Sequence, residues 1–216
     1  MVPLLRQAGH DVVTPTLTGT GGRSHLLTRD VDLALHVQDI VQVLEYEDLR
    51  EVVLVGHSYG GMVITGVAED AAARIVCLIY LGFLPPDDGQ CVCDVSPDGG
   101  AGGRQLAADE GNGWLVPPPS PAAFGISDPA EIAWIEARLR PMPLANFEHS
   151  VHAPTAAAAR LPRMCIFCTE SKGFDYVARR AQEAKLDYHE LAAGHDAMVT
   201  APVELTRVLF DFAATG

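Results

Sequence analysis

The sequence has few basic residues, and it lacks a long apolar run. Only 15 Lys and Arg residues stand against 28 Asp and Glu residues, which gives a formal net charge of −13. Binding to phosphate backbones or to anionic lipid depends on basic groups, so we expect no nucleic-acid partner and no membrane partner. No apolar stretch is long enough to cross a bilayer, and charge interrupts the first residues before a signal-peptide core develops. A cytoplasmic protein is therefore expected.

Cysteines are also few, and their number excludes a simple disulfide scaffold. There are five, at Cys77, Cys91, Cys93, Cys165 and Cys168. An odd number without a secreted spacing pattern indicates reduced thiols. Cys165 and Cys168 form a C-x-x-C, but the residues around them indicate a buried strand, in which positions three apart point to opposite faces. We interpret this pair as strand core instead of a redox or metal site.

What is present is an alternation of helical and strand patterns in 216 residues, enough for one domain with a substantial core. Apolar spacing predicts helices at residues 3–8, 33–47, 60–70, 176–185 and 202–213. Short apolar runs predict strands at residues 11–14, 52–55, 74–81, 164–169 and 187–191. Strand, helix and strand in succession imply parallel pairing. The predicted fold class is α/β, with a doubly wound, mostly parallel sheet.

One stretch departs from this alternation. Residues 85–154 are rich in Pro, Gly, Asp and Ala, with one convincing helix at Pro129–Arg140 that Asp128 caps. A long irregular segment within a compact domain is typical of a lid or binding segment. We therefore predict a core made of residues 1–84 and 155–216, with residues 85–154 as an inserted cap.

The strongest chemical signal is the G-x-S-x-G of Gly56-His57-Ser58-Tyr59-Gly60, set between a buried strand and a small-residue helix. The sharp turn projects the Ser58 hydroxyl above the end of the strand, which predicts Ser58 as a nucleophile. The Tyr59 N–H lies at a helix N-terminus and can stabilise an oxyanion. His57, inside the turn, is expected to orient it or to contact substrate. A tight glycine turn without chemistry is the alternative.

A serine nucleophile needs a base, and His195 stands in the expected place. It follows the strand that ends at Leu191 and precedes the last helix, so its ring can lie over the same sheet edge as Ser58. The other histidines show no metal-binding spacing, and we expect them at the surface or in the cap; they are His10, His25, His36, His149, His152 and His189. No metal site is predicted.

Residues 53–62 and 194–198 resemble the α/β-hydrolase superfamily, and the resemblance extends over nearly the whole chain. Within it, the chain is similar to bacterial carboxylesterases related to plant methylesterases and hydroxynitrile lyases, which residues 15–21 and 124–129 also fit. The resemblance implies an α/β-hydrolase fold and hydrolysis of a small apolar carboxylic ester through an acyl-enzyme, with no cofactor. A catalytically impaired pseudo-hydrolase or binding protein, or a lyase or cyclase on the same fold, stays an alternative.

The chain departs from its relatives at the third member of the catalytic triad. Plant methylesterases have an aspartate in the place of Ser171, and other relatives have one in the place of Gly82. The nearest carboxylates are Glu170 beside the first position, and Asp87 or Asp88 downstream of the second. We favour Glu170, because a loop could absorb one residue of register. A Ser–His dyad without an acid is equally open.

The usual first strands of the family have no counterpart ahead of the first helix. One of them ends in a His-Gly loop that donates the second oxyanion N–H, and it separates the strand resembling residues 11–14 from the nucleophile strand. An open gap would leave backbone groups unpaired in the core. We therefore expect residues 11–14 to pair directly with Val52–Val55, or a loop or partner chain, as in a homodimer, to fill the gap.

Overall fold

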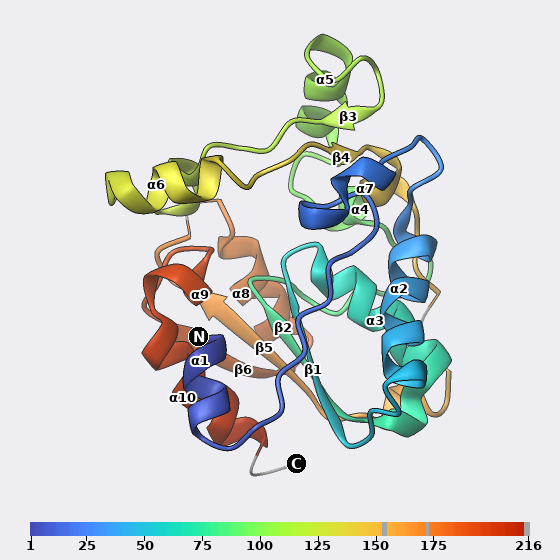
Figure 1. The fold of residues 1–216 in the computed structure, drawn as a ribbon, viewed down its shortest axis with the longest axis vertical. Helices are drawn as coiled ribbons and strands as arrows, with labels where there is room; N and C mark the ends of the chain where they lie inside the picture. The colour runs from blue at the N-terminus through green and yellow to red at the C-terminus, as the bar shows by residue number, and fades with distance from the viewer. Residues whose placement is uncertain (153–154, 172, 214–216) are drawn as a thin grey trace.

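The computed structural model describes residues 1–152, 155–171 and 173–213, and its centre is a parallel sheet (Figure 1). Four strands lie in the order β1-β2-β5-β6. Their bounds are β1 Val52–His57, β2 Ile75–Leu81, β5 Arg163–Cys168 and β6 Asp187–Leu191. All three pairings are parallel. The predicted α/β class and the parallel sheet are confirmed.

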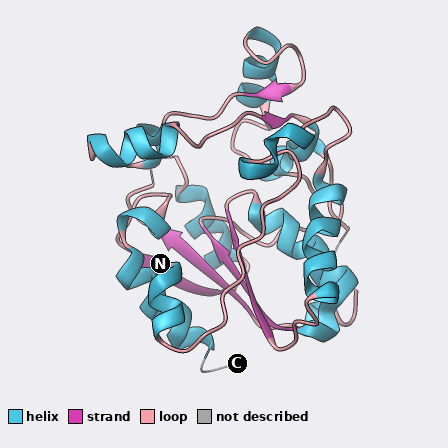
Figure 2. Ribbon diagram, in the orientation of Figure 1, coloured by secondary structure: helices cyan, strands magenta, loops and turns pink. Residues whose placement is uncertain are grey.

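Helices pack on both faces of this sheet (Figure 2). On one face lie α2 (Leu33–Tyr46), α3 (Gly60–Ala71) and α8 (Asp175–Glu183). On the other lie α1 (Val2–Gln7), α9 (Ala197–Thr200) and α10 (Pro202–Ala213). Along β2, Leu78 and Tyr80 belong to the first core cluster, whereas Ile79 and Leu81 belong to the second. This alternation is the two-residue period of a strand buried on both faces, so the sheet is doubly wound.

Helix α2 shows how the sequence pattern sets the local structure. The Asp32 side chain accepts a hydrogen bond from the Leu35 N–H and caps the helix, which begins at Leu33 as predicted. One face of α2 is buried against α3 and the sheet; its members are Leu33, His36, Val37, Val41 and Leu44. A histidine therefore lies within the apolar stripe.

The C-x-x-C belongs to the strand core, as predicted. Cys165 packs in the cluster on the α2 side of the sheet and Cys168 in the cluster on the α10 side. Both thiols are free and buried. Burial raises the pKa of Cys165 to about 12 and the pKa of Cys168 to about 11. The two side chains therefore point apart and stay protonated at neutral pH.

Short elements above the sheet make up residues 85–152 (Figure 1). They are α4 (Val92–Val95), α5 (Ala101–Asp109), α6 (Pro129–Glu136), α7 (Ala145–Glu148) and a hairpin of β3 (Leu115–Val116) and β4 (Met142–Pro143). The chain also contains 3₁₀ turns at η1 (Gly21–Leu26), η2 (Ala72–Arg74), η3 (Pro121–Phe124) and η4 (Ala158–Arg160). Asp128 caps α6 as predicted, although the helix ends before Arg140. The expected end of the cap, at residues 153 and 154, lies outside the described residues, and the division into core and cap stays a prediction.

The predicted strand at residues 11–14 is wrong. This segment is an irregular link between α1 and η1, and Val13 is 44% exposed. In the described part of the chain, β1 has only β2 as a sheet neighbour, so direct pairing with Val52–Val55 does not occur either. The reason is that a strand needs a hydrogen-bonding neighbour in register, which the four-residue pattern could not specify.

Candidate active site

The turn between β1 and α3 holds Ser58 in a strained conformation. Its φ of 52° lies in the left-handed region, which costs a non-glycine residue about 1–3 kcal/mol. The turn is fixed because the Ser58 N–H donates to the Leu81 carbonyl at 2.9 Å and the Gly61 N–H donates to the Ser58 carbonyl at 2.8 Å. Ser58 therefore lies at the end of β1, beside the end of β2. Strain at such a place is typical of a functional residue.

Tyr59 follows Ser58 and immediately precedes α3. Its φ and ψ of −48° and −32° are helical. Within the described residues the Tyr59 N–H has no hydrogen-bond acceptor. A free N–H at the start of a helix is suited to an anionic oxygen.

His195 lies in the loop between β6 and α9, and aromatic rings from other segments enclose its side chain. The residue is 1% exposed. Its N–H donates to the Phe124 carbonyl at 2.8 Å, and the Phe124 ring lies 4.9 Å from the imidazole. Phe174 stacks on the imidazole with centroids 4.0 Å apart and planes at 20°. The imidazole is therefore held in a largely apolar enclosure.

Ser58 and His195 lie at the same edge of the sheet. Ser58 is bonded to Leu81, and the next residue, Gly82, touches the His195 ring, since a Cβ on Gly82 would lie 3.0 Å from Nδ1. Yet neither Nδ1 nor Nε2 of His195 has a hydrogen-bond partner among the described residues. The Ser58–His195 hydrogen bond is thus not formed in this structure, and the dyad stays a prediction.

No carboxylate in the described part of the chain hydrogen-bonds the His195 ring. The Glu170 N–H donates to the Ala193 carbonyl at 3.0 Å, but the residue is exposed. Asp87 lies 3.9 Å from Arg180, and Asp88 lies 3.5 Å from His152. The structure thus brings the backbone of Glu170, but not its side chain, to the loop that carries His195. Its role as the acid stays a prediction.

His57 contacts the backbone of the His195 loop. Its Nε2 lies 3.0 Å from the His195 carbonyl, which can only accept, so Nε2 carries the proton. The same nitrogen is 3.7 Å from Asp196 Oδ1. Burial lowers the pKa of His57, against the effect of the Asp196 carboxylate, and burial raises the pKa of Asp196. In this structure His57 therefore links the turn between β1 and α3 to the loop that carries His195.

Burial also sets the protonation of His195. Desolvation, with a smaller contribution from neighbouring His57, lowers the pKa of His195 to about 3. The ring is therefore neutral at pH 7. A general base must be unprotonated to accept a proton, so this is the charge state that base catalysis requires.

We expect the free energy of unfolding to fall as the pH drops from 6.5 towards 3. An unfolded chain binds a proton at His195 near pH 6.5, whereas the folded protein binds it only near pH 3. The unfolded state therefore holds more protons across this window, and stability is lost with decreasing pH. The contribution of His195 to the free energy of unfolding, measured with urea, should be lower by about 1.7 kcal/mol at pH 5 than at pH 6.5. The His195→Gln variant should lose this part of the dependence of the unfolding free energy on pH. An unaltered pH dependence would contradict the lowered pKa of His195.

Sequence reasoning missed three residues of this region. His36, expected at the surface or in the cap, is fully buried in α2, with hydrogen bonds to Thr18 and Tyr59, and that expectation is wrong. Its position within the apolar stripe of α2 was the available signal. Phe124 and Phe174 enclose His195. Phe124 begins the segment 124–129 on which the family resemblance partly rests, but that resemblance gave it no role, and no local motif marks Phe174.

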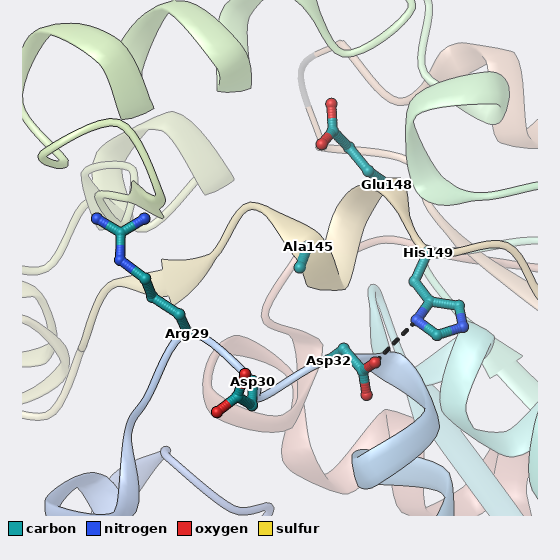
Figure 3. A pocket seen from close by; sticks show the side chains of 6 residues that line it. All are labelled: Arg29, Asp30, Asp32, Ala145, Glu148 and His149. Atoms are coloured by element: carbon teal, nitrogen blue, oxygen red, sulfur yellow. Dashed lines mark hydrogen bonds and ion pairs between the residues drawn. The ribbon is translucent and has the colours of Figure 1, made fainter.

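A separate charged pocket lies beside α7 (Figure 3). Its volume is about 560 Å³, and it is lined by Arg29, Asp30, Asp32, Ala145, Glu148 and His149. His149 Nδ1 lies 3.1 Å from Asp32 Oδ2, which links α7 to the first turn of α2. These lining residues do not include Ser58 or His195.

Two further classes of feature are absent from residues 1–152, 155–171 and 173–213. None of the helices there is both long enough and apolar enough to cross a membrane. In the same residues, no three His, Cys, Asp or Glu side chains are gathered as metal ligands.

The fold and the strained serine turn define a protein of the α/β-hydrolase class, and comparison with known proteins agrees. The sequence matches the alpha/beta hydrolase family over residues 1–208, and the chain belongs to this family. It is 35% identical to the carbendazim hydrolyzing esterase of Nocardioides sp. (strain SG-4G), over 95% of this chain and 89% of that protein. It is 26% identical to methylesterase 10 of Arabidopsis thaliana, over 97% and 84%. An extracellular alpha/beta-hydrolase from a Paenibacillus species superposes with a TM-score of 0.80 at 22% identity, over 98% and 90%.

Proposed function

We propose that the protein is a serine esterase that hydrolyses a small, apolar carboxylic ester. Ser58 Oγ attacks the ester carbonyl carbon, His195 accepts the serine proton, and the Tyr59 N–H donates to the developing oxyanion. The observation that carries the proposal is the strained, left-handed Ser58 at the end of a parallel strand, beside the loop of His195.

The relatives support ester chemistry. The protein from Nocardioides, 35% identical over nearly the whole chain, is named as an esterase, and the Arabidopsis relative is named as a methylesterase. The surroundings of His195 support an apolar substrate, because the rings of Phe124 and Phe174 that pack against the imidazole are apolar.

The reaction would proceed in two halves. In the first, the bond from Ser58 Oγ to the carbonyl carbon forms, the bond to the alcohol oxygen breaks, and His195 passes the serine proton to the departing alcohol. In the second, water attacks the acyl-enzyme, His195 accepts its proton and returns it to Ser58, and the carboxylic acid leaves. His195 Nε2 has no partner in this structure, so the contact with Ser58 would tighten when substrate binds.

The Ser58→Ala variant is expected to lose ester hydrolysis by about 10³-fold or more, because no other atom can form the acyl-enzyme. The assay is a panel of short and long p-nitrophenyl esters, together with labelling by a fluorophosphonate that reacts with activated serines. Wild type should carry the adduct on Ser58. Ser120→Ala, which changes an exposed serine in the cap, is the matched control and should behave as wild type. Equal hydrolysis by wild type and Ser58→Ala would exclude the esterase.

A non-catalytic binding protein is the second candidate. The specific observation in its favour is that both His195 nitrogens lack a partner within the described residues, and that no carboxylate orients the ring. Folded wild-type protein that neither hydrolyses any ester of the panel nor takes up the fluorophosphonate would support this candidate.

A further inference from the structure

A buried hydrogen-bond chain connects α2 to the residue that follows the nucleophile. His36 is 0% exposed; its Nε2 lies 2.8 Å from the Thr18 carbonyl and its Nδ1 lies 2.9 Å from the Tyr59 hydroxyl. A carbonyl oxygen can only accept, so Nε2 carries the proton and Nδ1 must accept from the Tyr59 hydroxyl. The direction of both bonds is therefore determined by the Thr18 carbonyl.

The charge state of both side chains is consistent with this direction. Burial lowers the pKa of His36, against opposing effects of Asp39 and Asp32. Burial also raises the pKa of Tyr59 well above its ordinary value, and Asp32 adds to this. At neutral pH the imidazole is thus uncharged and the phenol keeps its proton, as a bond donated from Tyr59 to His36 requires.

Asp39 holds Thr18, which is one end of this hydrogen-bond chain. The Asp39 carboxylate accepts from the Thr18 N–H at 2.6 Å and from the Thr18 hydroxyl at 2.9 Å. The same carboxylate lies 3.1 Å from Arg23 Nη1. Because Asp39 lies one turn after His36 on α2, the helix holds both His36 and the carbonyl to which it donates. His36 therefore has little freedom to move.

The near end acts on the turn of the nucleophile. The Tyr59 ring meets His36 edge-on, with centroids 5.7 Å apart and planes at 74°, and lies 5.8 Å from Phe147 in α7. These contacts hold the side chain of the residue whose N–H is the oxyanion donor of the proposed function. Fixing that side chain also restricts the φ and ψ that aim the N–H.

We propose that His36 is a positioning residue for the oxyanion hole, acting through the Tyr59 hydroxyl; this rests on the proposed esterase function. The oxyanion forms as Ser58 attacks and is absent from the bound ester, so a misaimed N–H slows the chemical step without weakening substrate binding. The loss should therefore be in kcat, with KM little changed.

Three substitutions separate the two hydrogen bonds. Tyr59→Phe removes only the hydroxyl. His36→Gln places a donor near the position of Nε2 and keeps the Thr18 contact, but offers Tyr59 no acceptor. His36→Asn places an acceptor oxygen near the position of Nδ1. We expect Tyr59→Phe and His36→Gln to lower kcat about ten- to a hundredfold, with KM within about twofold of wild type. His36→Asn should recover most of the loss.

The rate of fluorophosphonate labelling at Ser58 should fall in parallel, since that reaction needs the same N–H. The double variant His36→Gln/Tyr59→Phe should be no slower than either single variant, because each substitution removes the same hydrogen bond between His36 and Tyr59. All rates are measured at a temperature below the midpoint of thermal unfolding of each variant. Tyr59→Phe with wild-type kcat, a rise in KM instead of a fall in kcat, or independent effects in the double variant would overturn the proposal. If Ser58→Ala is inactive and these variants are not impaired, this inference alone fails; if Ser58→Ala is fully active, the esterase proposal fails.

Discussion

The Ser171→Asp variant is expected to hydrolyse esters with a kcat about ten to a thousand times that of the wild type. Loss of the triad carboxylate lowers kcat by about 10⁴, because the imidazole is no longer held in the correct tautomer. In this protein the His195 nitrogens have no hydrogen-bond partner in the described residues. The Ser171 hydroxyl is also buried without a partner, at 3% exposure. A carboxylate there would recover part of the missing effect.

The backbone joins Ser171 to the surroundings of His195. The Phe174 N–H donates to the Ser171 carbonyl at 3.5 Å, and Phe174 stacks on the His195 ring. On the other side, the Glu170 N–H is bonded to Ala193, two residues before His195. The loop that carries Ser171 is therefore attached to the loop that carries His195.

The pH profile gives an independent reading of the Ser171→Asp variant. With a pKa of about 3, His195 places the acid limb of the wild-type kcat/KM profile near pH 3. An adjacent carboxylate stabilises the imidazolium and raises the pKa of His195, so the acid limb should move towards neutral pH. Ser171→Asn, which is similar in size and uncharged, should not move it. An unmoved limb and wild-type kcat in folded Ser171→Asp would contradict the expected contact.

The Glu170→Gln variant tests whether Glu170, the residue favoured from the sequence, is the acid that orients His195. If Glu170 orients His195 during turnover, this variant should lose activity, and Ser171→Asp should restore it. If Glu170 stays at the surface, as in this structure, Glu170→Gln should retain wild-type kcat. The first result would show that the loop rearranges when substrate binds.

Features that depend on local pattern could be predicted from the sequence. The helix that begins at Leu33, the cap at Asp128 and the buried strand around Cys165 each rest on spacing within one element, and each was confirmed. The turn at Ser58 could be located because a G-x-S-x-G needs only its own strand and helix. Residues 11–14 failed because a strand also depends on its neighbour, which no local pattern contains.

The enclosure of the site could not be predicted in this way. Phe124 and Phe174 meet His195 from separate segments of the chain, so their contact depends on how those segments fold together. The chain from Thr18 through His36 to Tyr59 likewise joins three separate segments. Position along the chain could suggest His195 as base, but not its burial or its lowered pKa.

The Gly56→Ala variant is expected to lose more than about 3 kcal/mol of unfolding free energy, and with it most activity. A Cβ on Gly56 would lie 2.4 Å from the Gly60 carbonyl oxygen, 2.6 Å from its carbon and 2.9 Å from the Gly61 nitrogen. All three are backbone atoms, so no side-chain rotation can relieve the clash. The turn itself would have to open, which would displace Ser58.

The second glycine of the motif provides the matched control. Nothing lies within 4 Å of a Cβ added to Gly60, at the first position of α3. Gly60→Ala should therefore change the free energy of unfolding by less than about 1 kcal/mol, with helix propensity in its favour. Urea unfolding of the two variants beside wild type measures the contrast. Equal destabilisation would mean that the turn needs the backbone flexibility of glycine at both positions. The expected difference would show that the turn requires the absence of a side chain at Gly56 alone, where β1 lies against the start of α3.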